Sequence, residues 1–256
     1  MNREAMLRRL EALTGRIAFL CRDTVTGETL RYHADEPVTA ASVIKLCVLA
    51  EAFRQREAGE LDFDASVRIR PEDKKPSCGA LTYLHDGLEV TVRDLAVLMI
   101  ILSDNTATNL LIDRLGTERI NAFMTALGLS DRTRCRRKLF EPALAARGIT
   151  NHVTADDIGL LLEQMLRGEL VSPAASREML DILRDQRLNG KMPFHLKPRG
   201  IPCAHKTGED YDDGITHDAG IIFAAHPVIF CFLAEGADVP AAERALQDLA
   251  LMAAEE

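Results

Sequence analysis

The segment that decides the fold of this 256-residue chain reads GLEVTVRDLAVLMIILSDNTATN and covers residues 87–109. Thr91 and Asp94 have the spacing of a capping box, which predicts the start of a helix. The apolar run at 95–102 would continue this helix into the protein interior. The polar tripeptide SDN at 103–105 follows at once, so a buried helix would end on three side chains that form hydrogen bonds. Helix termination explains these residues as well as a function does.

A second polar pair lies upstream, where residues 42–45 read SVIK at the predicted start of an apolar helix. Ser42 and Lys45 would share one face of that helix, about a turn apart. A lysine among apolar neighbours loses its proton more readily, so Lys45 could accept the proton of the Ser42 hydroxyl. Free N–H groups at a helix start also stabilise negative charge. Taken alone, the pair fits better with a helix cap and a lysine that extends to water.

The third motif, KTG at residues 206–208, falls on a strand predicted to begin near Ile201. Glycine lets a backbone approach a ligand closely, and a lysine beside a threonine can hold an anionic substrate group. A chain of this length contains about one S-x-x-K match by chance, whereas SDN and KTG each have roughly a few hundredths of a chance match. The three motifs in this order therefore indicate one site.

The composition excludes several classes of partner. Lys and Arg number 31 against 39 Asp and Glu, and the net charge of −8 repels phosphate backbones and anionic lipids. His152, His205 and His217 lie near the motifs without the spacing of zinc ligands, so we interpret them as structural. We expect a small-molecule substrate, no nucleic-acid or membrane partner, no cofactor, no metal and a monomeric protein.

The cysteines and the N-terminus bear on the cellular compartment. C-x-x-C spacing is absent among the six cysteines, which are Cys21, Cys47, Cys78, Cys135, Cys203 and Cys231. Several lie in apolar runs, where a reduced thiol packs as a small hydrophobe. Residues 1–14 have the pattern of an amphipathic helix and not of a signal peptide. These features favour a cytoplasmic protein, and a periplasmic or secreted one would require that a leader was removed.

The two ends of the chain differ from its middle. Alternating apolar residues predict a hairpin near the N-terminus, and strand-like runs return after about residue 190, whereas helix caps and glycine stops alternate between them. This pattern predicts an α+β fold in which terminal helices flank an antiparallel sheet and an all-helical domain is inserted. The sheet domain would comprise 1–38 and 190–256, and the helical domain 39–189, with the site at their seam.

Together the three motifs resemble those of the penicillin-recognising serine enzymes, which are the class A β-lactamases and the penicillin-binding D-alanyl-D-alanine peptidases. The resemblance covers nearly the whole chain. Class A fits better, because residues 87–109 are similar to the class A segment that leads into and through its second motif. The resemblance implies a β-lactamase-like fold and a serine hydrolase that opens the β-lactam amide through an acyl-enzyme.

The same resemblance implies catalytic roles for the matching residues. Ser42 would be the acylated nucleophile, Lys45 its activating partner and Ser103 the proton shuttle. Residues 141–145, EPALA, are similar to the class A loop with the glutamate that activates the deacylating water, so Glu141 would be the general base. Whether that glutamate or the lysine is the acylation base is disputed for the family, and both assignments stay open.

The resemblance also implies a set of substrate contacts, made by Asn105, Lys206, Thr207, Gly208 and Glu209. Asn105 would bind the substrate and the lysine, and Lys206 with Thr207 would hold the substrate carboxylate. The backbone N–H groups of Ser42 and Glu209 would form the oxyanion hole.

The sequence departs from the class A pattern at two places. Class A enzymes usually have an asparagine four residues after the glutamate, and this chain has Ala145, so the deacylating water would lose a ligand. Slow deacylation is the hypothesis that follows. An acidic run, EDYDD at 209–213, follows the third motif. It is either a solvated loop or an entrance that disfavours anionic β-lactams and suits a cationic or neutral substrate.

Three functions therefore compete. The first is a serine hydrolase that acylates Ser42 with a β-lactam and deacylates through water bound to Glu141. The second is a related amidase, D-alanyl peptidase or esterase with another acyl donor. The third is a penicillin-binding homologue without turnover. The departures favour the second or third, and the complete set of nucleophile residues favours the first two.

Overall fold

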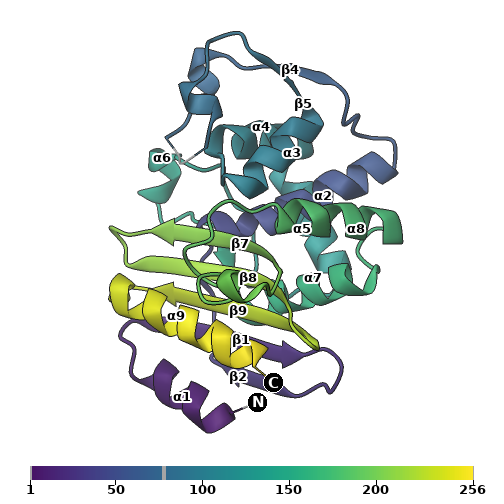
Figure 1. Cartoon of the computed structure of the whole chain (residues 1–256). Coiled ribbons are helices and arrows are strands. Elements are labelled where there is room, and N and C mark those ends of the chain that lie inside the picture. Colours follow the sequence, from purple (N-terminus) through teal and green to yellow (C-terminus); the bar gives the residue numbers. More distant parts are fainter. Residues whose placement is uncertain (1, 77–78, 256) are drawn as a thin grey trace.

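The computed structural model describes residues 2–76 and 79–255 of the chain. Its centre is a five-stranded antiparallel sheet with the strand order β2-β1-β9-β8-β7. The strands are β1 (Arg16–Asp23), β2 (Thr29–Tyr32), β7 (Cys203–Asp210), β8 (Ile215–Phe223) and β9 (Pro227–Glu235). The sheet therefore combines the two ends of the chain, which lie side by side in Figure 1.

The middle strands are buried on both faces of the sheet. β9 is buried without a break from Val228 to Ala234. It pairs with β1 along the full length of both strands, from Arg16 opposite Glu235 to Asp23 opposite Val228. A strand that is buried on both sides requires a layer of helices on each face of its sheet.

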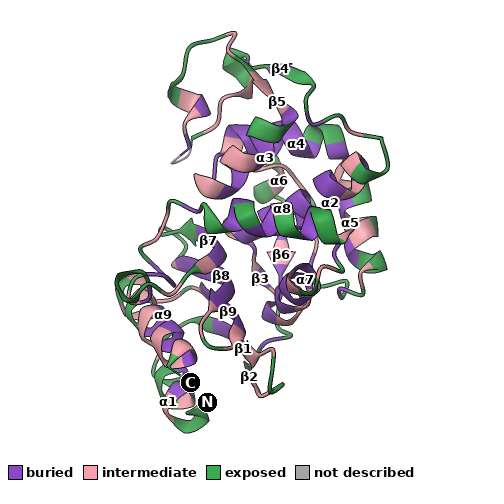
Figure 2. Ribbon diagram, turned by 45° about the vertical axis from the view of Figure 1, so that its right-hand side comes forward, coloured by how far each residue is buried: buried purple, intermediate pink, exposed green. Residues whose placement is uncertain are grey.

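The terminal helices α1 (Arg3–Glu11) and α9 (Val239–Ala254) cover one face. Their apolar side chains pack against Phe19, Phe230 and Phe232 of the sheet. The ring of Phe19 meets the other two edge to face, with centroid distances of 5.3 and 6.4 Å. The outward sides of both helices carry exposed residues, as Figure 2 shows, so these helices are amphipathic as the sequence predicts.

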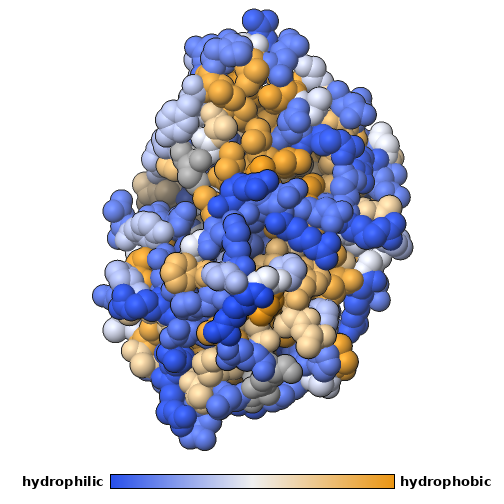
Figure 3. Space-filling model, in the orientation of Figure 1, coloured by the Kyte–Doolittle hydropathy of each residue, from blue (hydrophilic) through white to orange (hydrophobic). Residues whose placement is uncertain are grey.

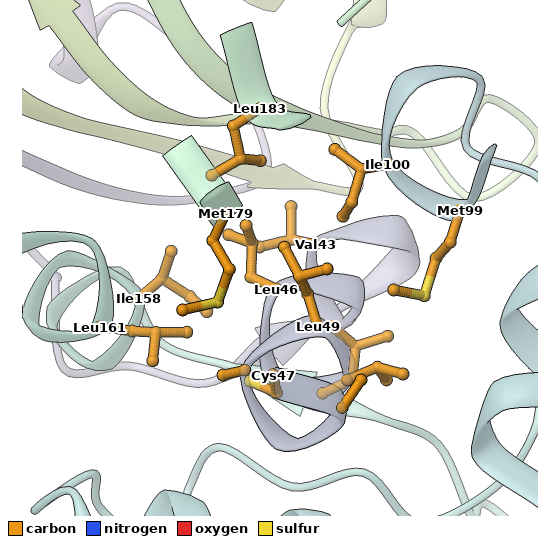
Figure 4. Packing of buried hydrophobic residues seen from close by; sticks show 14 of the residues in the cluster. Val43, Leu46, Cys47, Leu49, Met99, Ile100, Ile158, Leu161, Met179 and Leu183 are labelled. Carbon is orange, nitrogen blue, oxygen red and sulfur yellow. The ribbon is translucent and has the colours of Figure 1, made fainter. Parts of the chain in front are cut away.

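The middle of the chain forms a block of helices on the other side of the sheet. Its members are α2 (Lys45–Glu57), α3 (Val92–Ile101), α4 (Asn105–Leu115), α5 (Thr117–Ala126), α6 (Pro142–Ala145), α7 (Ala155–Arg167) and α8 (Pro173–Arg184). α2 is the central helix of the block, and Figure 4 shows its Leu46 and Leu49 among side chains from α3, α7 and α8. Replacing either leucine by alanine would cost about 2–5 kcal/mol of stability.

Short elements connect these layers. The small ladders are β3 (Val38–Thr39) with β6 (His152–Val153) and β4 (Ser66–Arg68) with β5 (Glu89–Thr91). The 3-10 helices are η1 (Ala41–Ile44), η2 (Pro71–Asp73), η3 (Leu81–Tyr83) and η4 (Lys197–Arg199). The β3–β6 ladder joins the segment before Ser42 to the segment after Glu141, so it ties two parts of the predicted site together.

The predicted α+β architecture, with terminal helices on an antiparallel sheet and helices between the two halves of that sheet, is confirmed. The structure fixes two boundaries near the motifs. α4 begins at Asn105, because the Asp104 side chain caps it by accepting a hydrogen bond from Ala107 N. β7 continues to Asp210, so the acidic run begins inside a strand. The division into two domains stays a prediction.

The described cysteines are all free, and they are Cys21, Cys47, Cys135, Cys203 and Cys231. Cys78 lies outside the described residues. Burial raises the pKa of the Cys21, Cys135 and Cys203 thiols to about 12. These thiols therefore pack as hydrophobic groups and are poor nucleophiles.

Charged and polar residues dominate the molecular surface in Figure 3, and apolar residues gather mainly at the top, near α3 and the β4–β5 ladder. Among the helices of residues 2–76 and 79–255, none is long and apolar enough to cross a membrane.

Candidate active site

A cavity of about 600 Å³ opens where the end of β7 faces α6, on the left side of the molecule in Figure 1. Ser42, Asn105, Glu141 and Glu209 all line this cavity. The first two motifs therefore reach the cavity through Ser42 and Asn105. Other predicted site residues do not line it, and these are Lys45, Ser103, Lys206, Thr207 and Gly208. The third motif joins the site through the hydrogen bond from Lys206 to Ser103.

Ser42 lies in the 3-10 turn η1, one turn before α2 begins at Lys45. The preceding residue, Ala41, has a φ of +41°, a strained conformation of the kind that clusters at active sites. The strand β7 passes directly behind the serine, because a Cβ atom added to Gly208 would lie 3.2 Å from Ser42 N. A side chain at position 208 would make a tight contact with the Ser42 turn, and glycine avoids it.

The Lys45 ammonium is fully buried and is held by the SDN motif. Its Nζ donates hydrogen bonds to the carbonyl oxygen of Ser103 at 2.8 Å, to Ser103 Oγ at 2.9 Å and to Asn105 Oδ1 at 2.8 Å. A buried ammonium requires such partners, since an unpaired charge in the interior is costly. The alternative interpretation, in which this lysine extends to water, is therefore wrong.

Ser103 Oγ lies between two ammonium groups. Besides Lys45, the fully buried Lys206 donates to this oxygen at 3.0 Å and to the carbonyl oxygen of Thr207 at 2.7 Å. A hydroxyl oxygen has two lone pairs, and the two lysines occupy both. The Ser103 O–H is left to donate toward a third group. Its backbone φ of +52° is a further strained value at this position.

The other two SDN residues fix the motif in the fold. Asp104 is fully buried, and its carboxylate accepts hydrogen bonds from Ala107 N at 3.0 Å and Leu81 N at 2.9 Å. Gly79 packs so closely on Asp104 that an added Cβ atom would lie 2.3 Å from Oδ2. Asn105 donates through Nδ2 to the carbonyl oxygen of Pro76 at 2.8 Å. Helix capping and site formation are therefore combined in one tripeptide.

Glu141 lies at the edge of the cavity and begins the short helix α6. Its Oε2 accepts a hydrogen bond from Lys138 N at 2.9 Å. Ala145, the position where class A enzymes have an asparagine, lines the same cavity and is exposed. Glu141 and Ala145, the two positions expected to hold the deacylating water, therefore line one cavity. The alanine side chain offers the water no hydrogen bond.

Two asparagines that the sequence analysis did not assign to the site hold the Glu141 segment. Asn109 of α4 exchanges two hydrogen bonds with the backbone of Leu139, both at 2.8 Å. Asn151 accepts from the backbone N–H groups of Arg136 and Arg137 and donates to the carbonyl oxygen of Arg137. Asn109 is the last residue of the 87–109 segment, one turn after the SDN motif. Its place among apolar residues could have identified it, because an amide that is buried there needs hydrogen-bond partners.

His217 of β8 connects the sheet to the segment before the nucleophile. Ala234 N donates to its Nδ1 at 3.0 Å, so Nε2 carries the proton and donates to the carbonyl oxygen of Thr39 at 2.8 Å. Complete burial lowers the pKa of His217 to about 4. Glu235 holds the same threonine by accepting from Thr39 N at 3.1 Å and from Thr39 Oγ1 at 2.9 Å. The predicted structural role of His217 agrees with these contacts.

The acidic run divides at Asp210. Glu209 and Asp210 line the cavity, whereas Asp212 and Asp213 belong to the turn after β7 and are exposed. Burial alone raises the pKa of Glu209, but the Lys191 ammonium and the Tyr211 hydroxyl outweigh it, so the net shift is downward. Glu209 is therefore a carboxylate, and part of the run faces the site.

In the described part of the chain, no group of three His, Cys, Asp or Glu side chains is arranged to hold a metal ion. His205 instead pairs with Asp218, its Nδ1 lying 2.8 Å from Oδ1, inside the sheet. The chemistry available in the cavity is that of hydroxyl, ammonium and carboxylate groups.

The model of the Beta-lactamase enzyme family matches residues 3–256. A similar solved structure is a beta-lactamase from Sphaerobacter thermophilus, with 32% identity over 98% of this chain and 94% of that chain and a TM-score of 0.87. An ancestral class A beta-lactamase shares 26% identity over 99% of this chain and 98% of its own, with a TM-score of 0.88.

A PBP-A mutant in an acyl-enzyme complex with penicillin G is also similar, at 25% identity over 98% of this chain and 94% of that chain, with a TM-score of 0.87. The similar structures therefore include both beta-lactamases and PBP-A.

Proposed function

This chain belongs to the beta-lactamase enzyme family, and from that premise we propose that it opens β-lactam amides through an acyl-enzyme at Ser42. The position of Ser103 Oγ between Lys45 and Lys206, beside the cavity that Ser42 lines, carries the proposal. A serine hydroxyl that accepts hydrogen bonds from two ammonium groups is suited to pass on a proton. Packing of a hydrophobic core would not require this arrangement.

In the acylation step, Ser42 Oγ attacks the lactam carbonyl carbon and the carbon–nitrogen bond breaks. The Ser103 hydroxyl donates its proton to the leaving nitrogen, and Lys45 or Lys206 replaces that proton. The Ser42 proton goes either through a water to Glu141 or to Lys45, which must first lose a proton and one of its three donated hydrogen bonds. Variants at Lys45 and Glu141 distinguish these two bases.

Substrate binding uses the edge of β7. Lys206 and Thr207 hold the substrate carboxylate, and the N–H groups of Ser42 and Glu209 stabilise the oxyanion. The close approach of β7 at Gly208 supports this arrangement, because it brings the strand to van der Waals distance from the nucleophile. Asn105 contributes its amide to the same wall of the cavity.

A second candidate is an acyl-enzyme that persists. Two observations favour it: Ala145 cannot hold a water, and the Glu141 carboxylate already accepts a hydrogen bond from Lys138 N. In that case the protein reacts with penicillins as a penicillin-binding enzyme does, and Glu141 contributes little to release of the acyl group.

The test is intact-protein mass spectrometry at successive times after mixing with benzylpenicillin. We expect an adduct on the natural protein that is absent from Ser42→Ala and present in Ser66→Ala, an exposed serine in β4. An adduct on Ser42→Ala, or none on the natural protein, contradicts acylation of Ser42 by β-lactams and leaves another acyl donor or a binding module.

Decay of the adduct separates the two candidates. If Glu141 is the general base, Glu141→Gln prolongs the adduct by about 10²-fold or more, while Glu118→Gln, an exposed residue of α5, does not. An adduct that persists equally in the natural protein and in Glu141→Gln identifies a penicillin-binding enzyme without efficient turnover.

A further inference from the structure

Lys191 is a buried lysine outside the three motifs. It lies between α8 and β7, and only 6% of its side chain is exposed. Its Nζ is 3.2 Å from Glu209 Oε2 and 3.7 Å from Glu243 Oε1. A lysine rarely gives up its hydration in this way, and the segment that carries it must therefore be held firmly.

The fold holds this segment through a buried pair in the sheet. Met192 N, the next backbone donor after Lys191, donates to Asp218 Oδ2 at 2.9 Å, and Asp218 is fully buried. The other oxygen of Asp218 pairs with His205, whose Nε2 lies 3.3 Å from Asn189 Oδ1. The segment is thus held to β7 and β8 on both sides of Lys191, through the backbone of Met192 and the side chain of Asn189.

The Lys191 ammonium also donates a hydrogen bond to the carbonyl oxygen of Gly208 at 3.2 Å. The carbonyl of Gly208 and the N–H of Glu209 belong to one planar peptide group and point in opposite directions. A carbonyl directed at Lys191 therefore turns the Glu209 N–H away from this lysine. The β7–β8 ladder, which pairs Gly208 with His217, sets the orientation of this peptide, and the contact with Lys191 adds a side-chain hydrogen bond that holds it.

The end of β7 separates two hollows. Glu209 and Ser42 line the large cavity on one side, whereas Lys191, Thr207 and Glu209 line a hollow of about 200 Å³ on the other. Gly208 faces Ser42, since a Cβ atom added to it would lie 3.2 Å from Ser42 N, and the Gly208–Glu209 peptide therefore contacts the Ser42 turn as well as Lys191. Lys191 supports the strand from the side that the substrate does not occupy.

We propose that Lys191 is a positioning residue for acyl transfer, which holds the Gly208–Glu209 peptide so that the Glu209 N–H completes the oxyanion hole opposite Ser42. This inference rests on the proposed acylation of Ser42. Tyr211 strengthens the arrangement, because its hydroxyl donates to Glu209 Oε2 at 2.8 Å and its ring lies 5.8 Å from Lys191 Nζ.

Two other roles make different predictions. Lys191 could bind the substrate carboxylate directly, but Glu209 and Glu243 already surround its charge and would repel a second anion. It could also be an ion pair that contributes only to stability. In that case its removal lowers the melting temperature and leaves the geometry of the oxyanion hole unchanged.

The test compares Lys191→Met, which removes the charge and keeps the length, with the conservative Lys191→Arg and with Lys197→Met, an exposed lysine of η4 in the same segment. Burst kinetics with a chromogenic cephalosporin give the acylation rate constant and the dissociation constant separately. Infrared difference spectra of the acyl-enzyme give the stretching frequency of the ester carbonyl, which falls as hydrogen bonds to it strengthen.

We expect Lys191→Met to lower the acylation rate constant about tenfold or more, with the dissociation constant unchanged, and to raise the carbonyl frequency. Lys191→Arg restores most of both, and Lys197→Met changes neither. An unchanged rate constant and frequency, or a loss confined to the dissociation constant, overturns the positioning role. If Lys191→Met does not fold, Lys191→Gln gives the same comparison with a milder change.

A measurement without substrate separates this inference from the proposed function. In the free protein, the ¹⁵N and amide proton shifts of Glu209 are expected to move in Lys191→Met and not in Lys197→Met. Unmoved Glu209 shifts contradict the inference even where β-lactams acylate Ser42. Absence of a penicillin adduct on the natural protein, with moved shifts, contradicts the proposed function and leaves the contact itself intact.

Discussion

The two sides of the candidate site are built differently. On the acylation side, defined by Ser42, which lines the cavity, and by Lys45, Ser103 and Lys206, which do not, both lysines are fully buried and share hydrogen bonds with one serine. On the deacylation side, defined by Glu141 and Ala145, the segment after the glutamate is mostly exposed, and the Glu141 carboxylate accepts a hydrogen bond from its own loop.

This difference bears on which step of the proposed reaction is faster. Groups on packed helices and strands keep their geometry, whereas groups on exposed loops vary more easily. The acylation side is anchored by α2, α4 and β7. The deacylation side depends on Asn109 and Asn151 to hold a short loop. If the proposed acylation of Ser42 takes place, we therefore expect the acyl-enzyme to form more readily than it is hydrolysed.

The largest expected effect is that of Lys45→Met. Removal of the ammonium takes one of two lysine hydrogen bonds from Ser103 Oγ and removes the hydrogen bond from Lys45 to Asn105 Oδ1. We expect the acylation rate constant to fall by about 10²–10⁴-fold, as measured by the burst of a chromogenic cephalosporin. The control is Lys197→Met. A loss below about tenfold would show that the buried lysine is not required for acylation. The proposed difference between the acylation side and the deacylation side would then be wrong.

The next effect concerns the pH dependence of stability on the acylation side. Since the pKa of His217 is about 4 in the folded protein and 6.5 in the unfolded chain, the unfolded chain binds a proton in this window that the folded protein does not. Stability therefore falls as the pH falls from 6.5 to 4, by about 3 kcal/mol in total.

The variant His217→Gln tests this assignment, because glutamine can donate to the Thr39 carbonyl and accept from Ala234 N without titrating. Urea unfolding at pH 7 and pH 4 is expected to show that the natural protein loses about 3 kcal/mol more than the variant. Equal losses in the two proteins would mean that other groups carry the acid sensitivity.

A gain is expected on the deacylation side from Ala145→Asn. The amide supplies the missing ligand of the water, so deacylation should accelerate about tenfold, which corresponds to one hydrogen bond of about 1.4 kcal/mol. The rate at which the penicillin adduct decays measures deacylation. Ala143→Asn, an exposed neighbour in α6 that does not line the cavity, is the control. If deacylation does not accelerate, Glu141 and not Ala145 limits the rate of deacylation.

The smallest effect is expected at the cavity entrance. Asp210 lines the cavity and Asp212 does not, although both are exposed carboxylates of the same acidic run. Asp210→Asn should raise the second-order rate of acylation by an anionic penicillin about two- to threefold at low salt, and added salt should abolish the gain. An equal gain in Asp212→Asn would mean that net charge matters and position does not.

Much of the fold and of the acylation side is predictable from local pattern. The capping box at Thr91, the caps at Thr154 and Ser172, and the apolar runs of the strands all appear in the structure. Their physics is short-range, because a cap or a periodic face depends on residues within a turn of one another. The continuation of β7 to Asp210 was not predictable, because Glu209 and Asp210 pair with Thr216 and Ile215 only in the folded sheet.

By itself, the sequence determined the α+β class, the order of the three motifs and the residues that could take part in acyl transfer. Only the tertiary structure decided that Ser103 lies between Lys45 and Lys206, that Glu209 and Asp210 face the cavity, and that Lys191 holds the strand behind it. The physical reason is that these contacts join residues far apart in the chain. Whether a buried charge finds its partner depends on how helices and strands pack, and no local pattern records that.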